Sequence, residues 1–364
     1  VANRGITTLK GIEYFPNLKN LSCSKNPLDK LDVSTLTELT SLTCMADGLS
    51  ELNLYENNKL QRLNCANNQL TSLVVLSDSL TKLDCYVNKL ETLDLTSVPN
   101  LKSLRCDQNS LKSLDLSNNQ NLTSINCTYN NLTSLDLSKN TSLANVTNAM
   151  IGNQSVSLKA NFDGNMIVIP FENSNLDNDN YVSSTLDDYG DGSGFNFASF
   201  IAYDVSEIDG GIEYYCNTKL AGSENMKVSV TVSRDFHQVS FYADSENTSL
   251  IGRAFANDGQ SVTAPEIKNP PQCKVLDTWS DTLDNVTGDK SIYANWKDAH
   301  SYSLSSFSND TATVKCSACG DTFTLSFINA VNSKKGDEKY SPYLDVTKDG
   351  VINAKDYALL NKMK

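Results

Sequence analysis

The chain has 364 residues, of which 39% are hydrophobic and 20% are charged, so it can form packed cores and is not predicted to be disordered. Its net charge of −13 at pH 7 disfavours nucleic acid and anionic membranes as partners, because both carry the same sign of charge. No apolar run reaches the ~18 residues of a membrane span. The chain starts at Val1 without a methionine, so we expect a mature or trimmed chain, and the missing signal peptide says nothing about export.

Residues 18–148 repeat the pattern L-x-x-L-x-C-x-x-N-x-L-x-x-L-D-L-S. A period of about 20–29 residues with this consensus is the leucine-rich repeat, whose coils stack because one coil cannot bury its own apolar face. The pattern predicts about seven coils, which begin near Ile6 and fade over 143–148. The second half of each coil also predicts a strand, as at 93–95 and 135–137.

Six of the ten cysteines share one position of the repeat, with gaps of 21, 21, 20, 21 and 21 residues: Cys23, Cys44, Cys65, Cys85, Cys106 and Cys127. A free thiol at an inward position behaves as a small hydrophobic group, so we expect these cysteines to be buried and reduced. Equivalent residues of stacked coils lie about 4.7–4.9 Å apart, too far for unstrained disulfides between coils. A ladder of thiols that binds metal is the functional alternative.

Most coils also carry an asparagine where the chain turns inward after the strand: Asn26, Asn68, Asn88, Asn109 and Asn130. A buried side-chain amide can pair with the backbone groups that such a turn leaves unpaired. Asp47 replaces the asparagine in the second coil, which keeps an acceptor and loses the amide donor.

These coils resemble the short cysteine-bearing leucine-rich repeats of bacterial surface proteins, which are related in style to internalins. The resemblance implies a secreted or cell-surface protein that binds a protein or glycan through the outward residues of its sheet. Tyrosine and arginine dominate binding hot spots, so we expect the anchors to be Tyr86, Arg105 and Tyr129. Polar residues of the same face join them as candidates: Asp84, Asp107 and Asn126. The alternative is a solvated face without a ligand.

Residues 151–236 lose the repeat and predict strands, as at 166–169 and 227–232, separated by turns rich in glycine and aspartate. We expect a β-rich capping or sandwich-like module after a solenoid of residues 1–150, because a bare terminal coil would expose apolar surface. The acidic segment 187–192 is interpreted as a solvated turn, with a calcium site as the alternative.

Residues 237–297 contain a strand with Val239 and Phe241, a Thr-Ala-Pro turn at 263–265, Trp279 and a final apolar strand at 292–296. This order resembles the internalin-type B-repeat, a small β-grasp-like module of bacterial surface proteins. The resemblance implies a stalk or a partner-binding spacer. Thr278 stands where the family usually has glycine before the tryptophan.

Residues 298–326 form a short predicted β module that carries His300 and a Cys-x-x-Cys-Gly motif at Cys316 and Cys319. Similar short modules recur in secreted proteins of gut anaerobes. One histidine and two cysteines give three ligands, one fewer than a structural zinc site uses, so zinc is not expected. A local disulfide or two free thiols are the alternatives. Cys216 and Cys273 have no evident role in the sequence.

Residues 327–364 contain the clearest chemical motif, a 12-residue loop of the EF-hand type over 345–356 with Gly350 at its sixth position. A helix is predicted to follow from Tyr357. The loop predicts one bound calcium ion, with ligands Asp345, Thr347, Asp349, Val351 through its carbonyl, Asn353 and Asp356. Aspartate at position 12 resembles dockerin modules, which implies docking to a cohesin-like partner. A dockerin has two such loops and this sequence shows one, so we expect a partial module.

The sequence contains no catalytic signature of the G-x-S-x-G or H-E-x-x-H type, and Cys216 and His237 have no local context of a protease. We therefore predict a mainly β, non-enzymatic chain with a solenoid, small β modules and a short C-terminal helical calcium-loop module. Its predicted function is secreted or cell-surface binding and adhesion. One alternative is a non-catalytic component of a cellulosome-like dockerin–cohesin assembly. The other is a carbohydrate-active enzyme, for which no region is long enough to form the usual catalytic barrels.

Overall fold

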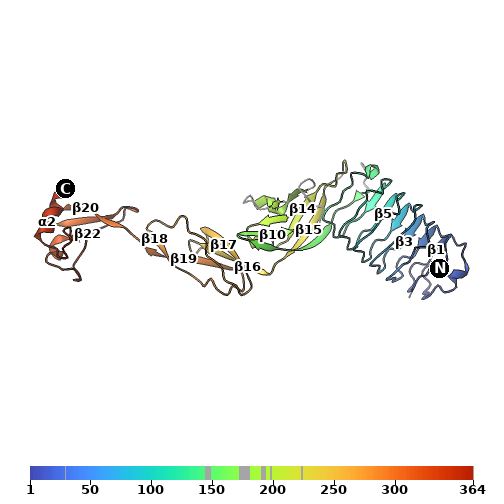
Figure 1. Cartoon of the computed structure of the whole chain (residues 1–364), viewed down its shortest axis with the longest axis horizontal. Coiled ribbons are helices and arrows are strands. Elements are labelled where there is room, and N and C mark those ends of the chain that lie inside the picture. The colour runs from blue at the N-terminus through green and yellow to red at the C-terminus, as the bar shows by residue number, and fades with distance from the viewer. Residues whose placement is uncertain are drawn as a thin grey trace. The chain divides into compact units, whose positions relative to one another are not determined.

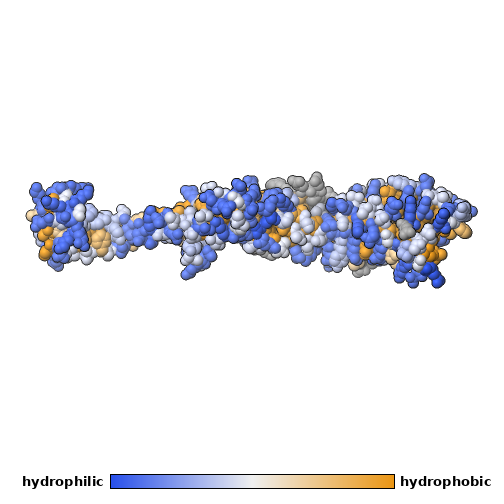
Figure 2. Space-filling model, turned by 90° about the horizontal axis from the view of Figure 1, so that it is seen from below, coloured by the Kyte–Doolittle hydropathy of each residue, from blue (hydrophilic) through white to orange (hydrophobic). Residues whose placement is uncertain are grey.

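The computed structural model describes residues 1–28, 30–143, 149–171, 181–189, 194–196, 199–222 and 224–363. The chain is mainly β, as predicted, and it divides into two compact units, Val1–Phe236 and His237–Lys364. Within the described ranges no helix has both the length and the apolar character to cross a membrane. The visible surface of both units is mostly hydrophilic, with apolar residues in small separate groups (Figure 2).

A parallel seven-stranded sheet runs through the first unit and confirms the predicted solenoid (Figure 1). The first six strands have three residues each, and the central leucine or isoleucine of each is buried while its neighbours face outward. Strictly in-register pairing, such as Leu42 with Leu63, stacks equivalent side chains on each other. The strands are β1 (Asn20–Ser22), β2 (Ser41–Thr43), β3 (Arg62–Asn64), β4 (Lys82–Asp84), β5 (Ser103–Arg105), β6 (Ser124–Asn126) and β7 (Ala149–Met150).

Each coil turns inward after its strand through one residue in the left-handed region, with φ between 53° and 61°: Lys25, Ala46, Asn67, Val87, Gln108 and Tyr129. The asparagine that follows performs the predicted pairing. The Asn68 amide donates to the carbonyls of Cys44 and Cys65 at 2.8 and 3.0 Å, and its oxygen accepts from the N–H groups of Asp47 and Leu49. One side chain thus makes four hydrogen bonds, three of which link its coil to the preceding one.

The second half of each coil is not a strand among the described residues, so the strands predicted at 93–95 and 135–137 are wrong. The chain is extended there and buries alternate leucines, but the aspartate forms a local turn instead of a ladder. Asp94 accepts hydrogen bonds from the N–H and hydroxyl of Thr96, at 2.9 and 2.7 Å. Such an Asx turn competes with strand pairing and explains the recurring Asp-Leu-Ser motif.

Two four-stranded sheets follow the solenoid in the first unit, with orders β12-β13-β10-β9 and β11-β14-β15-β8. They contact the last coil directly: the Tyr214 hydroxyl donates to the Thr133 carbonyl at 2.6 Å, and the Leu137 N–H donates to the Thr218 carbonyl at 2.8 Å. The strands are β8 (Gln154–Lys159), β9 (Asn161–Asp163), β10 (Met166–Pro170), β11 (Tyr181–Ser184), β12 (Gly194–Asn196), β13 (Ser199–Ala202), β14 (Ile212–Cys216) and β15 (Met226–Ser233).

The second unit begins with a sheet of order β17-β16-β19-β18, in which β16 and β19 are parallel. Its core contains Val239, Phe241 and Ile292, and the Trp279 ring packs edge-on against Phe241 with centroids 5.0 Å apart. The residues of the B-repeat resemblance therefore meet in one core. The strands are β16 (Phe236–Tyr242), β17 (Leu250–Asn257), β18 (Lys274–Trp279) and β19 (Lys290–Asp298).

A second sheet of this unit, β20-β21-β22, shares one hydrophobic cluster with the C-terminal segment. Phe307 of the sheet, Ile352 of the predicted calcium loop and Leu360 of the last helix all belong to it. The helix begins at Ala354, before the predicted Tyr357, because Asn353 caps it together with Asp356. The elements are β20 (Tyr302–Ser308), β21 (Thr311–Cys316), β22 (Thr322–Ser326), α1 (Phe327–Ala330) and α2 (Ala354–Leu360).

All six repeat cysteines are free and fully buried, and burial raises the pKa of the Cys106 thiol well above its usual range. Cys106→Asp is therefore expected to destabilise the fold by more than about 4 kcal/mol, because it buries an unpaired charge. The matched control is Asn121→Asp on the exposed side of the next coil, which should change stability by no more than about 0.5 kcal/mol. Denaturant unfolding measures both. Rapid labelling of all six thiols in the native protein would contradict their burial.

Asp47 provides a test of the asparagine ladder. Burial raises its carboxyl pKa, and its oxygens accept from the Asn26 N–H at 2.8 Å and the Cys23 thiol at 3.5 Å. A raised folded-state pKa means that the charged form is penalised above that pKa, and that the penalty disappears below the unfolded value. Asp47→Asn should therefore raise the melting temperature near neutral pH, and the gain should shrink below about pH 4. A gain independent of pH would show that the charge is not the cause.

Candidate functional site

The outward face of β4 and β5 brings four of the predicted ligand-binding residues together. Asp84 and Arg105 are partners in the strand register. The Arg105 guanidinium lies over the Tyr86 ring, 4.0 Å from its centroid, and its Nε lies 3.5 Å from Oδ1 of Asp107. Stacking and an ion pair therefore favour one orientation of the arginine side chain.

The two carboxylates of this group are buried although they lie on the outward face. Asp84 is 6% exposed and Asp107 is 4% exposed, and one oxygen of each receives no hydrogen bond. Lys82 Nζ lies 3.2 Å from Asp84, so each carboxylate is compensated mainly by a neighbouring cation. Tyr86, Arg105 and their acids form a rigid charged and aromatic patch.

The other two predicted residues lie on the next coil. Asn126 pairs with Arg105 in the sheet register, and its side-chain oxygen accepts from the N–H and hydroxyl of Thr128. Tyr129 is 59% exposed and occupies the left-handed turn position just beyond the sheet. Its ring is therefore available at the edge of the patch, whereas Asn126 is held by its own coil.

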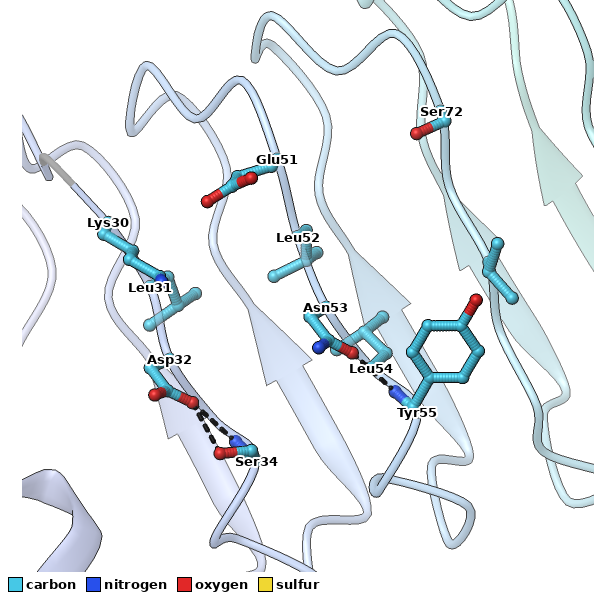
Figure 3. A pocket seen from close by; sticks show the side chains of 11 residues that line it. Lys30, Leu31, Asp32, Ser34, Glu51, Leu52, Asn53, Leu54, Tyr55 and Ser72 are labelled. Carbon is cyan, nitrogen blue, oxygen red and sulfur yellow. Dashed lines mark hydrogen bonds between the residues drawn. The ribbon is translucent and has the colours of Figure 1, made fainter.

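A hollow of about 440 Å³ lies between the second halves of neighbouring coils (Figure 3). Asp32 accepts from the N–H and hydroxyl of Ser34, and Asn53 accepts from the N–H of Tyr55, so these polar groups are occupied by local turns. None of the predicted ligand-binding residues lines this hollow.

The predicted calcium loop gathers three carboxylates, Asp345, Asp349 and Asp356, with one oxygen of each within 4.8 Å of the others. Asp345 is 3% exposed and Asp356 is fully buried. The Thr347 hydroxyl lies 3.3 Å from Asp345 and 2.8 Å from Asp356, so it shares the same centre. An all-oxygen set of this charge fits a hard divalent cation such as calcium.

The loop backbone supports this arrangement. Gly350, with φ of 84°, provides the sharp turn, and its N–H donates to Asp345 at 2.8 Å. The Tyr340 hydroxyl also donates to Asp345 and holds the pKa of that carboxyl below its usual range. The Asn353 oxygen accepts from the Lys355 N–H as the helix cap, and its amide donates to the Val351 carbonyl at 3.1 Å. Asn353 therefore serves as the helix cap, and the oxygens of the three aspartates and Thr347 are the groups that lie close together.

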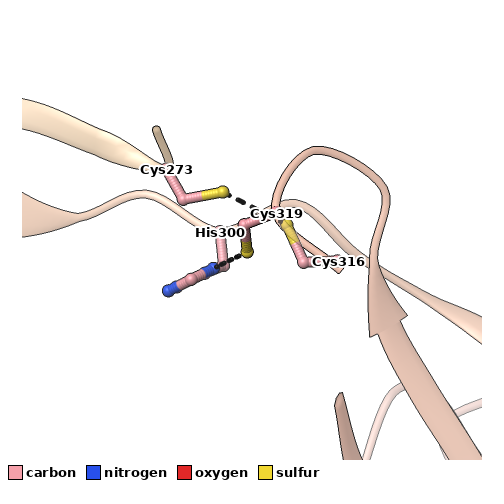
Figure 4. A group of neighbouring side chains, drawn as sticks. All are labelled: Cys273, His300, Cys316 and Cys319. Carbon is pink, nitrogen blue, oxygen red and sulfur yellow. Dashed lines mark hydrogen bonds between the residues drawn. The ribbon is translucent and has the colours of Figure 1, made fainter. Parts of the chain in front are cut away.

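A second cluster brings together Cys273, His300, Cys316 and Cys319, with one ligand atom of each within 4.8 Å of the others (Figure 4). The Cys273 and Cys316 sulfurs are 3.4 Å apart, and the Cys319 sulfur lies 3.2 Å from Nδ1 of His300. The sequence had indicated three of these groups. The fourth, Cys273, immediately precedes β18, and the pairing of β18 with β19 brings it close to the other three residues.

Electrostatics at this cluster favour a charged sulfur. The backbone N–H of Cys319, followed by the His300 side chain, lowers the pKa of the Cys316 thiol to about 5. Its neighbour Cys273 shows the opposite effect: hydrogen bonding to Cys319 raises its pKa to about 12. The thiolate is the form of cysteine that binds metals and reacts as a nucleophile.

Within the part of the chain that the structure describes, the remaining sequence candidates belong to neither of these two clusters. Cys216 is buried in the first unit, which raises its thiol pKa to about 12, and its sulfur contacts the Thr133 carbonyl at 3.9 Å. His237 pairs with Asp258 at 3.1 Å. In the acidic segment 187–192, Asp187 accepts from Tyr181 and Ser184, and residues 190–192 lie outside the described ranges.

Coils of 20–21 residues with inward leucines and cysteines, one short strand each and an asparagine ladder define a leucine-rich-repeat solenoid. A scan against protein-family models finds no match, and a search of curated proteins finds none either. Three solved structures similar to the chain are all distant.

One is the functional domain of InlJ from Listeria monocytogenes, which is described as including a cysteine ladder. It is 22% identical to this chain, with a TM-score of 0.33. The match covers 64% of this chain and 65% of the InlJ chain, so this chain spans just under two thirds of its length. InlP of Listeria monocytogenes is 20% identical with a TM-score of 0.38, over 60% of this chain and 67% of that one. The leucine-rich-repeat domain of APL1B is 21% identical with a TM-score of 0.28, over 33% and 45%. The assignment as a leucine-rich-repeat protein rests on the geometry of the coils themselves.

Proposed function

We propose that this chain is a non-enzymatic binding protein, secreted or attached to a cell surface, that recognises a protein or glycan through the outward face of β4–β6. The observation that carries the proposal is Arg105, held between the Tyr86 ring and the Asp107 carboxylate. A binding anchor that is already ordered loses little entropy when a partner docks. The net charge of −13 favours a neutral or basic partner over an acidic one.

The binding test starts with a screen of the full chain against glycans and secreted proteins. Against any partner found, Tyr86→Ala and Arg105→Ala should each weaken binding by on the order of 1–3 kcal/mol. Because the two side chains stack, the double variant should lose less than the sum of the single variants. Lys139→Ala, on the exposed second half of a coil, serves as the control and should bind as the wild type does. Equal affinity of all these variants would remove the patch from the interface.

The C-terminal loop is proposed to bind one calcium ion through Asp345, Thr347, Asp349, Asp356 and the Val351 carbonyl. Support comes from two buried carboxylates, Asp345 and Asp356, that lie close to a third, since a divalent cation would offset the repulsion among three like charges held this close together. The ion would hold the loop beside Ile352, which belongs to the hydrophobic cluster of the C-terminal sheet, and beside Asn353 and Asp356, which cap the last helix. Extracellular calcium would then stabilise this module.

Calorimetry with calcium tests this site. We expect one equivalent to bind with a dissociation constant of roughly 10⁻⁶–10⁻³ M, because a neutral hydroxyl replaces a charged ligand at the third position. Calcium should also slow hydrogen exchange over 345–363. Asp349→Asn, which preserves the helix cap, should weaken binding, and Asp345→Ala with Asp356→Ala should abolish it. Glu338→Gln, exposed and outside the cluster, should change nothing. The absence of both heat and protection in the wild type would refute the site.

A second candidate function is docking of the C-terminal module to a cohesin-like partner. The observation in its favour is the exposed apolar surface of the last helical turns, where Leu359 is 40% exposed and Met363 is 49% exposed. Calcium-dependent binding of the full chain to a cohesin would support it. Calcium binding without such an interaction would leave a structural loop.

A further inference from the structure

We propose that Cys273, His300, Cys316 and Cys319 bind one zinc ion, which fixes the junction between the two sheets of residues 237–363. This site is independent of the ligand face and of the calcium loop. The ligands come from three separate segments: the residue before β18, the residues after β19, and the end of β21 with the turn that follows it. Figure 4 shows the four side chains next to one another, with the Cys273 sulfur facing Cys316 and the Cys319 sulfur facing His300.

The distances fit a tetrahedral centre. Zinc–sulfur bonds of about 2.3 Å place the sulfurs of such a site about 3.8 Å apart, and a histidine nitrogen slightly closer. The Cys273 and Cys316 sulfurs are 3.4 Å apart, the His300 nitrogen is 3.2 Å from Cys319, and all four ligand atoms lie within 4.8 Å of one another. Shifts of a few tenths of an ångström would bring these two distances to those of a zinc site, and no other pair of ligand atoms is more than 4.8 Å apart.

The donor set identifies the metal. Three thiolates and one imidazole form a soft set that favours zinc, whereas the oxygen-only loop at 345–356 fits calcium. A disulfide would use only two of the three sulfurs. It would not explain why a third thiol and an imidazole lie in the same cluster. Four protein ligands also close the coordination sphere, which is the pattern of a structural zinc site and not of a catalytic one.

The surroundings of the cluster hold the ligands in place. Nε2 of His300 faces Oδ1 of Asp298 at 3.9 Å, so the ring nitrogen away from the cluster lies near a carboxylate, as in many zinc sites. The His300 ring stacks on Tyr302, whose hydroxyl donates to Asp321 at 2.6 Å. These contacts orient the imidazole and the Cys-x-x-Cys turn toward each other.

Cys273 itself is held in a costly conformation. Its φ of 57° lies in the left-handed region, which a residue with a side chain rarely adopts without a reason. Its carbonyl accepts from the Ala299 N–H at 2.8 Å, and Gln272 donates to the Ala318 carbonyl across the junction. The strained residue is therefore the one that joins the first sheet to the Cys-x-x-Cys turn.

The ion would link two sheets that have separate hydrophobic cores. The first sheet has its own core around Phe241 and Ile292, and the second has a separate core around Phe307 and Leu360. With zinc bound, the two sheets should unfold together. Without zinc, each should unfold according to its own smaller core.

The experiment uses the full chain, purified under reducing conditions and loaded with zinc or with cobalt as a spectroscopic probe. We expect one zinc per chain by elemental analysis and a thiolate-to-cobalt charge-transfer band. Cys273→Ser and the exposed Cys319→Ser should each lower zinc affinity more than a hundredfold, because loss of a ligand exceeds the about 10–100-fold cost of losing an outer partner. Asp298→Asn should weaken zinc binding by about 10–100-fold.

Two controls make the result specific. Asp277→Asn removes a carboxylate from the same pair of strands, where it pairs with Lys297 at 3.0 Å, and should leave zinc binding unchanged. Cys216→Ala removes a thiol of the first unit and should retain one zinc. Circular dichroism of each variant separates loss of the ion from loss of the fold. A disulfide among the three cysteines in the freshly reduced protein, or no metal bound by the folded wild type, would overturn the proposal, as would unchanged zinc affinity in Cys273→Ser.

Discussion

The backbone groups left unpaired where each coil turns inward are the constraint on which the rest of the solenoid depends. Buried N–H and C=O groups must find partners, and just beyond the strand the Cys44 carbonyl and the N–H groups of Asp47 and Leu49 pair with a side chain instead of the backbone of the next coil. A side-chain amide such as Asn68 solves this by reaching the coil before it. This link holds successive coils in strict register, which stacks the cysteines in the interior and places Tyr86 and Arg105 side by side on the outside. The geometry of the ligand face thus follows from a hydrogen-bonding requirement in the core.

The repeats could be predicted from the sequence because their information is local and recurs every 20 or 21 residues. The burial of the cysteines and the position of the asparagines followed directly from that period. The second strand was predicted wrongly because alternating leucines also suit an extended chain without a ladder, and the aspartates pair with their own turns. A second amide ladder was missed: Asn119 donates to the Leu95 and Val98 carbonyls of the preceding coil. Its asparagine stands among other polar residues, where the sequence gives no sign of burial.

The carboxylate cluster and the cysteine–histidine cluster differ in how much of each could be predicted from the sequence. The proposed calcium loop is one continuous segment, so residue types and spacing were enough to indicate the three carboxylates that the structure brings together. The cysteine cluster joins residues 43 positions apart, and its fourth member depends on strand pairing. Antiparallel register places Lys274 opposite Asp298, which brings Cys273 beside the segment that carries His300. Only a prediction of that register could have connected Cys273 with the Cys-x-x-Cys turn.

The solenoid and the sheets of the second unit differ in the interactions that stabilise them. The solenoid shares one core along all its coils, so no coil needs a cross-link, and its thiols serve as packing groups. The sheets of the second unit are small and have separate cores, and cores of that size rarely supply more than about 3–5 kcal/mol on their own. Small extracellular modules commonly compensate with disulfides or metal ions. An oxygen-lined loop and a sulfur-lined junction, both in the second unit, place the proposed ions where hydrophobic burial is least able to hold the fold.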